Sequence, residues 1–244
     1  MSGYSDNPRD PNRTIPTHAA ASPAIDAELR GFMLRVFNIM AGGLAMTGIV
    51  AYTAASSGAY AAIAGTPLFW LVLLAPFGLA LLLGFRIRRM SPVAAQAAFW
   101  VYAALMGLSL AGIFLVYTGD SIARVFFISA GTFAATAAWG YTTRTDLSRL
   151  GSFLVMGLIG ILLASVVNLF VGSSALQFAL SVMGVVVFTG LTAWDTQRLK
   201  TEYLYGAMDG ETAERSSILG ALSLYLNFIN LFTLLLQLLG QREE

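Results

Sequence analysis

The polar side chains that could do chemistry lie in or beside two apolar runs near the C-terminal end of the chain. Asp195 closes the apolar run 175–194, in the stretch "GLTAWDTQRLK". The later stretch "ALSLYLNFINLF" places two asparagines inside a second run. At about 100° per residue, four side chains of that run share about a quarter-turn of a helix: Ser223, Asn227, Asn230 and Gln237. An unpartnered amide in hydrocarbon costs roughly 2–7 kcal/mol. We therefore expect this polar stripe to face protein or water.

One carboxylate opposite amides and hydroxyls can form a constriction that attracts cations. Asp195 would face the polar stripe if the two runs lie side by side in opposite directions. Calcium prefers about 6–8 oxygen ligands, so Asp195 with neutral oxygens predicts only a weak, passing contact with calcium. Conduction requires such a contact. The alternative is an interfacial carboxylate balanced by Arg198 and Lys200.

The composition indicates that these residues lie on membrane-spanning helices. The chain has 244 residues, of which 57% are hydrophobic and 11% are charged, whereas a soluble domain carries about 25% charged residues. A net charge of +1 lacks the basic field that nucleic-acid binding needs. Cysteine is absent, His18 is the one histidine and Lys200 the one lysine. This inventory argues against thiol chemistry, metal clusters and Schiff-base chemistry, and predicts neither an enzyme nor a resident cofactor.

Seven apolar runs are long enough to cross a bilayer core, which takes about 20 residues. They are Phe32–Ala54, Leu68–Phe85, Ala94–Tyr117, Ser121–Tyr141, Leu150–Val171, Ala175–Trp194 and Ile218–Leu239. With the N-terminus inside, every Lys and Arg except Arg124 and Arg242 falls in a cytoplasmic segment, as the positive-inside rule demands.

These runs predict an all-α integral membrane protein. We expect a flexible cytoplasmic tail over residues 1–30, a seven-helix transmembrane domain over 31–240 and a short C-terminal tail over 241–244. A re-entrant seventh run would instead return the C-terminus to the inside, but about 22 residues favour a full crossing.

Small residues recur at every fourth position in two of the runs, which predicts close helix packing there. The two ladders are Ala103, Gly107 and Ala111, and Ala130, Ala134 and Ala138.

Four stretches resemble bacterial members of the transmembrane BAX inhibitor motif family. They are "AALMGLSLAGIFLVYTGDSIARVFFISAGTF", "GYTTRTDLSRLGSFLVMGLIGILLASVVNLF", "SSALQFALSVMGVVVFTGLTAWDTQRLK" and "GALSLYLNFINLFTLLLQLLG". The resemblance covers residues 31–240. It implies a seven-helix bundle with a central seventh helix, and a pH-sensitive leak channel of the bacterial inner membrane with calcium as the permeant ion.

The resemblance also implies a pH sensor made of two aspartates, which share a proton when the pore is shut. The first maps onto Asp195 and the second onto Asn227, because the family's "LYLDFINLF" reads "LYLNFINLF" here. Two close carboxylates cannot both ionise readily, and an Asp–Asn pair lacks that repulsion. We expect the latch to persist, with Asn227 donating to ionised Asp195, and its pH dependence to weaken or shift to acid. The family's latch arginine lies near the cytoplasmic end of the second helix, where Arg86, Arg88 and Arg89 all stand.

Two functions remain open at this level. The first is a calcium-leaking channel in the lipid bilayer. The second is a non-conducting regulator that binds another integral membrane protein, such as a membrane-bound AAA protease that grips the N-terminal tail. Calcium flux through the purified protein distinguishes the two functions.

Overall fold

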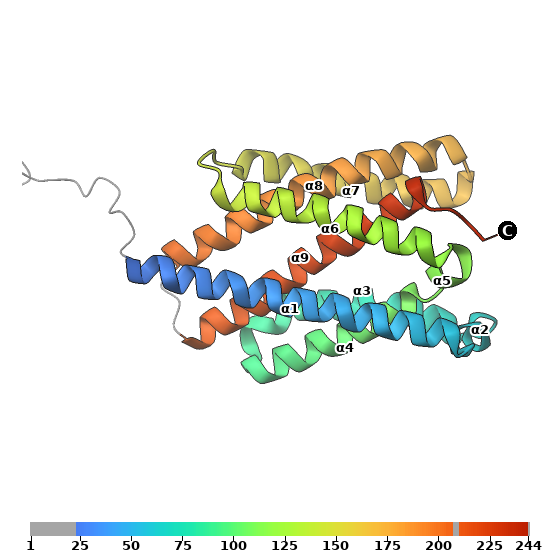
Figure 1. The fold of residues 1–244 in the computed structure, drawn as a ribbon, viewed down its shortest axis with the longest axis horizontal. Coiled ribbons are helices and arrows are strands. Elements are labelled where there is room, and N and C mark those ends of the chain that lie inside the picture. The colour runs from blue at the N-terminus through green and yellow to red at the C-terminus, as the bar shows by residue number, and fades with distance from the viewer. Residues whose placement is uncertain (1–22, 207–209, 244) are drawn as a thin grey trace, which may run out of the picture.

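The computed structural model describes residues 23–206 and 210–243. Within these residues, seven helical segments are long and apolar enough to cross a membrane, which confirms the expected all-α bundle (Figure 1). The long helices are α1 (Pro23–Ser56), α3 (Leu68–Arg86), α4 (Pro92–Leu110), α6 (Gly119–Thr142), α7 (Ser148–Val171), α8 (Ser174–Tyr205) and α9 (Gly210–Leu239). Short helices join them: α2 (Ala59–Ala64), η1 (Ile87–Arg89) and α5 (Ile113–Val116). Helix α1 begins within the segment expected to be a tail, and the remainder of that tail lies outside the described residues.

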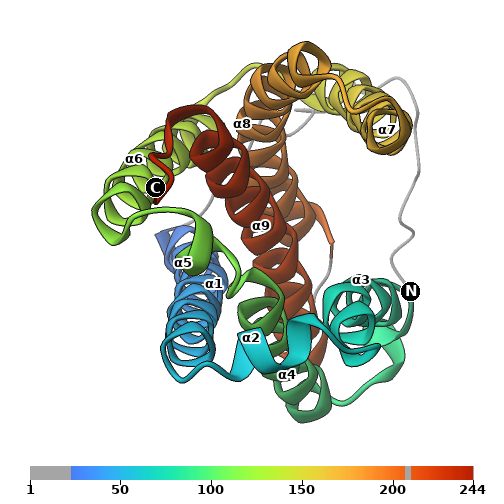
Figure 2. The same cartoon turned by 90° about the vertical axis from the view of Figure 1, so that its right-hand side faces the viewer.

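Helix α9 is the centre of the bundle. In its most apolar window 67% of the residues are buried, against 11–33% in the other six spans. Viewed from the end, α9 crosses the middle of the molecule, and the other long helices surround it (Figure 2). It packs against α8, α1, α6 and α4. The predicted central seventh helix is therefore confirmed.

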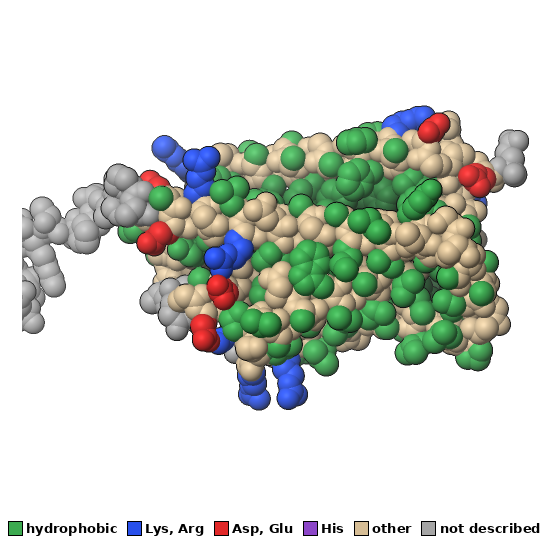
Figure 3. All heavy atoms as spheres, turned by 60° about the horizontal axis from the view of Figure 1, so that its bottom comes forward, with side chains coloured by type: hydrophobic (Ala, Val, Ile, Leu, Met, Phe, Trp, Pro, Cys, Tyr) green, Lys and Arg blue, Asp and Glu red, His purple; other side chains and the backbone are tan. Residues whose placement is uncertain are grey.

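The bundle has two ends, which we call proximal, where α1 begins, and distal, where α9 ends. Helix α8 ends and α9 begins at the proximal end, and the C-terminus is distal (Figure 1). The 30 residues of α9 span about 45 Å at 1.5 Å per residue, more than the roughly 30 Å of a bilayer core. Charged side chains gather toward the two ends, and hydrophobic side chains cover the length between them (Figure 3). Helix α9 is therefore long and apolar enough to cross fully, as expected for a span that is not re-entrant.

Hydropathy predicts that the sixth span ends at Trp194, but the helix continues beyond it. Helix α8 continues to Tyr205, so Asp195 lies within a helix, and Lys200 is helical instead of standing in a loop. Ion pairs one turn apart stabilise such polar extensions, and Arg198 lies 3.6 Å from Glu202. Hydropathy detects where a helix leaves the membrane, not where the helix itself ends.

The third span is interrupted near its distal end. Helix α4 stops at Leu110 and the chain resumes as α5. Gly112 lies at the break against Tyr60, whose hydroxyl oxygen would be 2.7 Å from a Cβ at this position. After α5, the C-terminal tail is hydrogen-bonded to the start of α6, because Gln241 donates to the Ser121 hydroxyl at 2.9 Å. The distal ends of α6 and α9 are thus tied together.

The two small-residue ladders behave differently. Gly107 allows α4 to approach α1 so closely that a Cβ would lie 2.7 Å from the Thr47 carbonyl oxygen, and the predicted close packing is confirmed there. In the second ladder Ala134 and Ala138 are exposed, so the prediction of close packing is wrong for them. The close approach of α6 occurs instead at Gly140, where a Cβ would collide with the Ala193 carbonyl of α8.

This close approach yields a matched pair of substitutions within α6. We expect Gly140→Leu to lower the free energy of unfolding by about 3 kcal/mol, because an overpacked contact with backbone forces the two helices apart. Gly131→Leu serves as the control, since a Cβ at Gly131 meets nothing within 4 Å. Thermal unfolding of both variants in one detergent measures the difference. Equal melting temperatures would contradict the assigned α6–α8 crossing.

Candidate functional site

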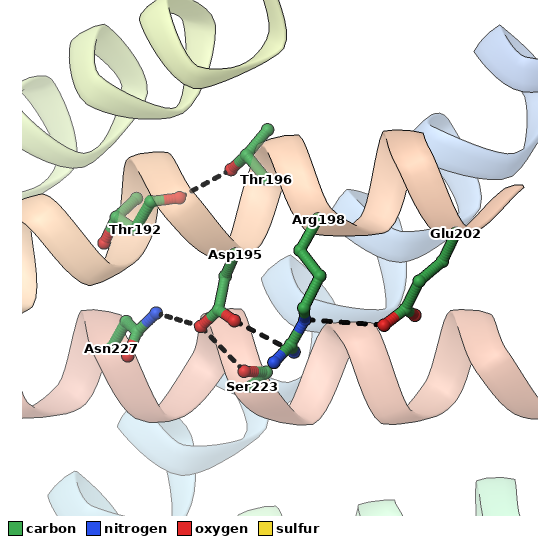
Figure 4. A network of polar contacts seen from close by, with 7 residues as sticks. All are labelled: Thr192, Asp195, Thr196, Arg198, Glu202, Ser223 and Asn227. Carbon is green, nitrogen blue, oxygen red and sulfur yellow. Dashed lines mark hydrogen bonds and ion pairs between the residues drawn. The ribbon is translucent and has the colours of Figure 1, made fainter. Parts of the chain in front are cut away.

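Asp195 is a buried carboxylate of α8 that faces the central helix. Its exposed fraction is 4%. Its Oδ2 atom accepts two hydrogen bonds from α9, one from Asn227 Nδ2 at 2.7 Å and one from Ser223 Oγ at 2.8 Å (Figure 4). The structure thus brings together three of the residues that the sequence singled out. A hydrogen bond to a charged group is among the stronger ones in proteins.

Arg198 is the third partner of Asp195. Its Nη2 atom lies 2.9 Å from Asp195 Oδ1, one turn along α8. The angle at this contact does not make a hydrogen bond, so Oδ1 is neutralised by charge but has no aligned donor. The same guanidinium lies 4.8 Å from the centre of the Trp194 ring and 3.6 Å from Glu202. Arg198 therefore stands between a buried and an exposed carboxylate (Figure 4).

A cavity at the proximal end reaches this arginine. Its volume is about 660 Å³, and its charged lining side chains are Arg198, Glu202 and Arg215. Because Arg198 contacts both the cavity and Asp195, water or an ion in the cavity is one side chain away from the buried carboxylate. Among the described residues, no group of three or more acidic or histidine side chains is placed to hold a metal ion.

Neighbouring elements fix the position of this part of α8. Lys200 Nζ donates to the Tyr141 carbonyl oxygen at the end of α6, at 2.9 Å. Gln197 bonds both the Leu147 backbone N–H and the Thr145 carbonyl of the α6–α7 connection, each at 2.8 Å. Helix α8 cannot rotate without breaking these bonds, so the direction of Asp195 toward α9 is set by its surroundings.

The α6–α7 connection itself is shaped by Asp146. Its carboxylate accepts a hydrogen bond from the Ser148 backbone N–H at 2.9 Å, at the start of α7. Hydrogen bonds from the Ser148 hydroxyl and backbone hold the pKa of this exposed carboxyl below its usual value. The connection that anchors Gln197 thus has a local polar scaffold of its own.

The polar stripe of α9 does not form one cluster. Asn230 Nδ2 donates to the Leu226 carbonyl of its own helix at 2.8 Å. Gln237 Oε1 accepts from Gln177 Nε2 at 2.9 Å and from Ser181 Oγ at 3.0 Å. The α8–α9 interface is therefore polar toward both ends.

Between its polar ends the α8–α9 interface is apolar. Leu231 is fully buried, and Leu234 packs directly onto Gly184 of α8. Asn227 and Gln237 are about 15 Å apart along the helix axis. The apolar section thus separates the Asp195 cluster from the distal amides.

Two of the three arginines predicted to hold the latch do not pair with Asp195 in this conformation. Arg86 and Arg89 are exposed at the end of α3 and in η1, and the side chain of Arg88 lies outside the described residues. Among the described side chains, the ion partner of Asp195 is Arg198. From the sequence, Arg198 is expected only as an interfacial counter-charge. Its spacing of three residues from Asp195 nevertheless places the two side chains on one face of a helix.

Sequence reasoning missed a second polar anchor of α9. The Tyr225 hydroxyl lies 2.6 Å from Thr47 Oγ1, and Thr47 donates to the Ala103 carbonyl oxygen at 2.9 Å. The ring of Tyr102 meets that of Tyr225 edge-on, with centroids 5.5 Å apart. These contacts join α9 to α1 and α4. Tyr225 and Asn227 lie two residues apart in the sequence. Their spacing alone did not show that Tyr225 faces α1 and α4 while Asn227 faces α8.

Two asparagines of α9 can be compared directly. We expect Asn227→Leu to cost about 1.5–3 kcal/mol of unfolding free energy, because it removes a donor from a buried carboxylate. Asn230→Leu should cost less than about 1 kcal/mol, since Asn230 bonds only its own helix. Both substitutions add the same apolar side chain to the same helix. Chemical unfolding in one detergent measures the two values, and equal losses would contradict the assigned roles.

Comparison with known proteins agrees with this architecture. A family model described as "Inhibitor of apoptosis-promoting Bax1" (Bax1-I) matches residues 29–244. A Rickettsia prowazekii protein, the uncharacterised RP147, is 45% identical over 96% of this chain and 99% of its own length. The inner membrane protein YbhL of Escherichia coli K12 is 44% identical over 89% of this chain and 94% of its own. The family model covers nearly all of the described residues, which form a helical bundle of seven apolar spans. This chain therefore belongs to the Bax1-I family of membrane proteins.

Proposed function

We propose that this chain is a cation leak channel of the bacterial inner membrane, with calcium as its permeant ion and the proximal end in the cytoplasm. The observation that carries the proposal is Asp195, a carboxylate buried within a membrane-spanning helix. Such a group is expensive in a membrane and marks an ion or proton pathway in other proteins. The proximal basic residues and the inner-membrane relative support the location.

The conformation described here is the shut one. Asp195 Oδ2 accepts from Asn227 and Ser223, and Oδ1 faces the Arg198 guanidinium, so the protein itself surrounds both carboxylate oxygens. Beyond this contact, Leu234 of α9 packs directly onto Gly184 of α8, so an apolar contact lies between the Asp195 cluster and Gln237. Apolar constrictions close channels by excluding water. Opening requires α9 to move away from α8.

In a pair of aspartates, the second carboxylate needs a bound proton to lie beside the first. Here Arg198 balances the charge of Asp195 instead. With Asn227 at the second position, Asp195 also meets an amide donor instead of a like charge. Neither contact requires a bound proton. The leak is therefore expected to change little across neutral and mildly acid pH, where a pair of aspartates would change its protonation.

Calcium entry into dye-loaded liposomes tests the function. We expect Asn227→Asp to create a rise in flux as the pH falls from about 8 to 5, because two facing carboxylates take up protons in this range and full protonation removes the charged acceptor. The unmodified chain should show no such transition. Asn230→Asp is the matched control, since Asn230 does not face Asp195.

The outcomes of the liposome experiment separate the two functions left open by the sequence. Flux that requires Asp195, and that gains pH dependence only with Asn227→Asp, supports a channel with a blunted sensor. Absence of flux from every folded form would contradict the channel and favour a non-conducting regulator of another membrane protein.

Removing the arginine should open the latch. We expect Arg198→Gln to raise calcium flux several-fold at pH 7. Without its counter-charge, the Asp195 carboxylate is free to attract the permeant cation. The effect should be smaller than the rupture of a fully buried pair, since the Arg198 side chain is 36% exposed. Arg215→Gln is the control, because Arg215 lines the same cavity but pairs with Glu211. Equal flux from both variants would contradict the role of Arg198.

A further inference from the structure

Two hollows lie between α1 and α6, along the side of the central helix. Both helices pack against α9, and α9 is visible between them (Figure 1). The distal hollow has a volume of about 290 Å³ and lies among α1, α6, α9 and the α4–α5 segment, with Gly48, Ala123 and Phe232 in its lining. The other measures about 330 Å³ and lies between Phe37 and the second half of α6. We call these two hollows together the α1–α6 opening.

The chemistry of the lining selects an apolar occupant. Thr47 is the one residue with a side-chain hydroxyl among those that line the distal hollow. Its hydroxyl is already bonded to Tyr225 and to the Ala103 carbonyl. The second hollow is lined by alanine and aromatic side chains, including the Ala134 and Ala138 that fail to pack against another helix. A polar ligand would find no free partner in the distal hollow.

The size of the hollows indicates that their occupant is an extended hydrocarbon chain and not a helix. At roughly 30 Å³ for a water-sized group, each hollow holds about ten such groups. A helix with its side chains is about 10–12 Å across and would have to displace α1 or α6. Both of those walls are membrane-spanning helices, so the medium beside the opening is the hydrocarbon of the bilayer.

We propose that the α1–α6 opening binds an acyl chain of a bilayer phospholipid, which reaches Phe228 and Phe232 of the central helix. These two rings line the distal hollow and are largely buried, at 3% and 9% exposure. Lipids that merely surround the bundle would not reach them. The inference does not depend on the proposed channel function.

A charged side chain stands where the phosphate of such a lipid belongs. Arg124 is exposed and follows the lining residue Ala123 in α6, close to the distal end. It makes no ion pair among the described residues. A guanidinium binds phosphate through paired hydrogen bonds. An acyl chain of a lipid held there extends along α6 from Gly119 toward Phe127, a distance of about 12 Å.

A photoreactive phospholipid tests the site on the whole protein. The lipid carries a diazirine in its acyl chain and is mixed into liposomes containing the purified chain, and the labelled residues are mapped by mass spectrometry. We expect label on the segment 228–232 of α9, as well as on the exposed face of α7. Gly48→Phe fills the distal hollow, because a Cβ at Gly48 has open space around it, and should reduce the α9 label at least fivefold.

The controls make the result decisive. Gly160→Phe places the same ring in open space on α7 and should leave the α9 label unchanged. Arg124→Gln should reduce the α9 label, and Arg242→Gln, at the same end of the bundle, should not. Label on α7 without label on α9 would overturn the proposal. A second copy of the chain that covers the α1–α6 opening would give this same result. An α9 label that Gly48→Phe leaves unchanged would overturn it as well.

Discussion

A carboxylate held inside a membrane bundle requires that donors be brought to it, and much of this structure serves that requirement. Asp195 receives two hydrogen bonds from α9 and a counter-charge from α8. Helix α9 must therefore lie against α8 over its proximal half, although its own sequence is largely apolar. Its opposite face is fixed to α1 through Tyr225 and Thr47. Packing on both sides makes α9 the central helix. In the channel that we propose, movement of α9 relative to α8 is the route to opening.

The asparagine at position 227 makes the contact with Asp195 an amide–carboxylate hydrogen bond. Two carboxylates at hydrogen-bond distance need a shared proton, so their attraction depends on pH. An amide donor and a guanidinium satisfy one carboxylate without a proton. The same two helices can thus be held together by a latch that responds to pH or by one that does not.

Hydropathy predicted the number of spans, and helical period with the cost of buried amides predicted that Asp195 faces the polar stripe of α9, because these signals act locally. The central position of α9 and the pairing of Asp195 with Asn227 were implied by the family resemblance. Arg198 was expected only as an interfacial counter-charge of Asp195, because the apolar run ends at Trp194 and hydropathy does not show that α8 continues to Tyr205. Helical period also joined Gln237 to the same stripe, although Gln237 bonds Gln177 and Ser181. Which neighbour faces each residue depends on how the helices cross, and spacing along one helix does not carry that information.

The most direct test of the account is a reversible covalent bond between α8 and α9. The chain has no native cysteine, so Gly184→Cys with Leu234→Cys introduces one pair at a point where the two side chains meet. Calcium flux through the double variant is measured in liposomes before and after reduction, with each single variant as control. The account predicts that the oxidised form is blocked and that reduction restores the flux. Equal flux in the oxidised and reduced forms would contradict the claim that separation of α9 from α8 opens the pore.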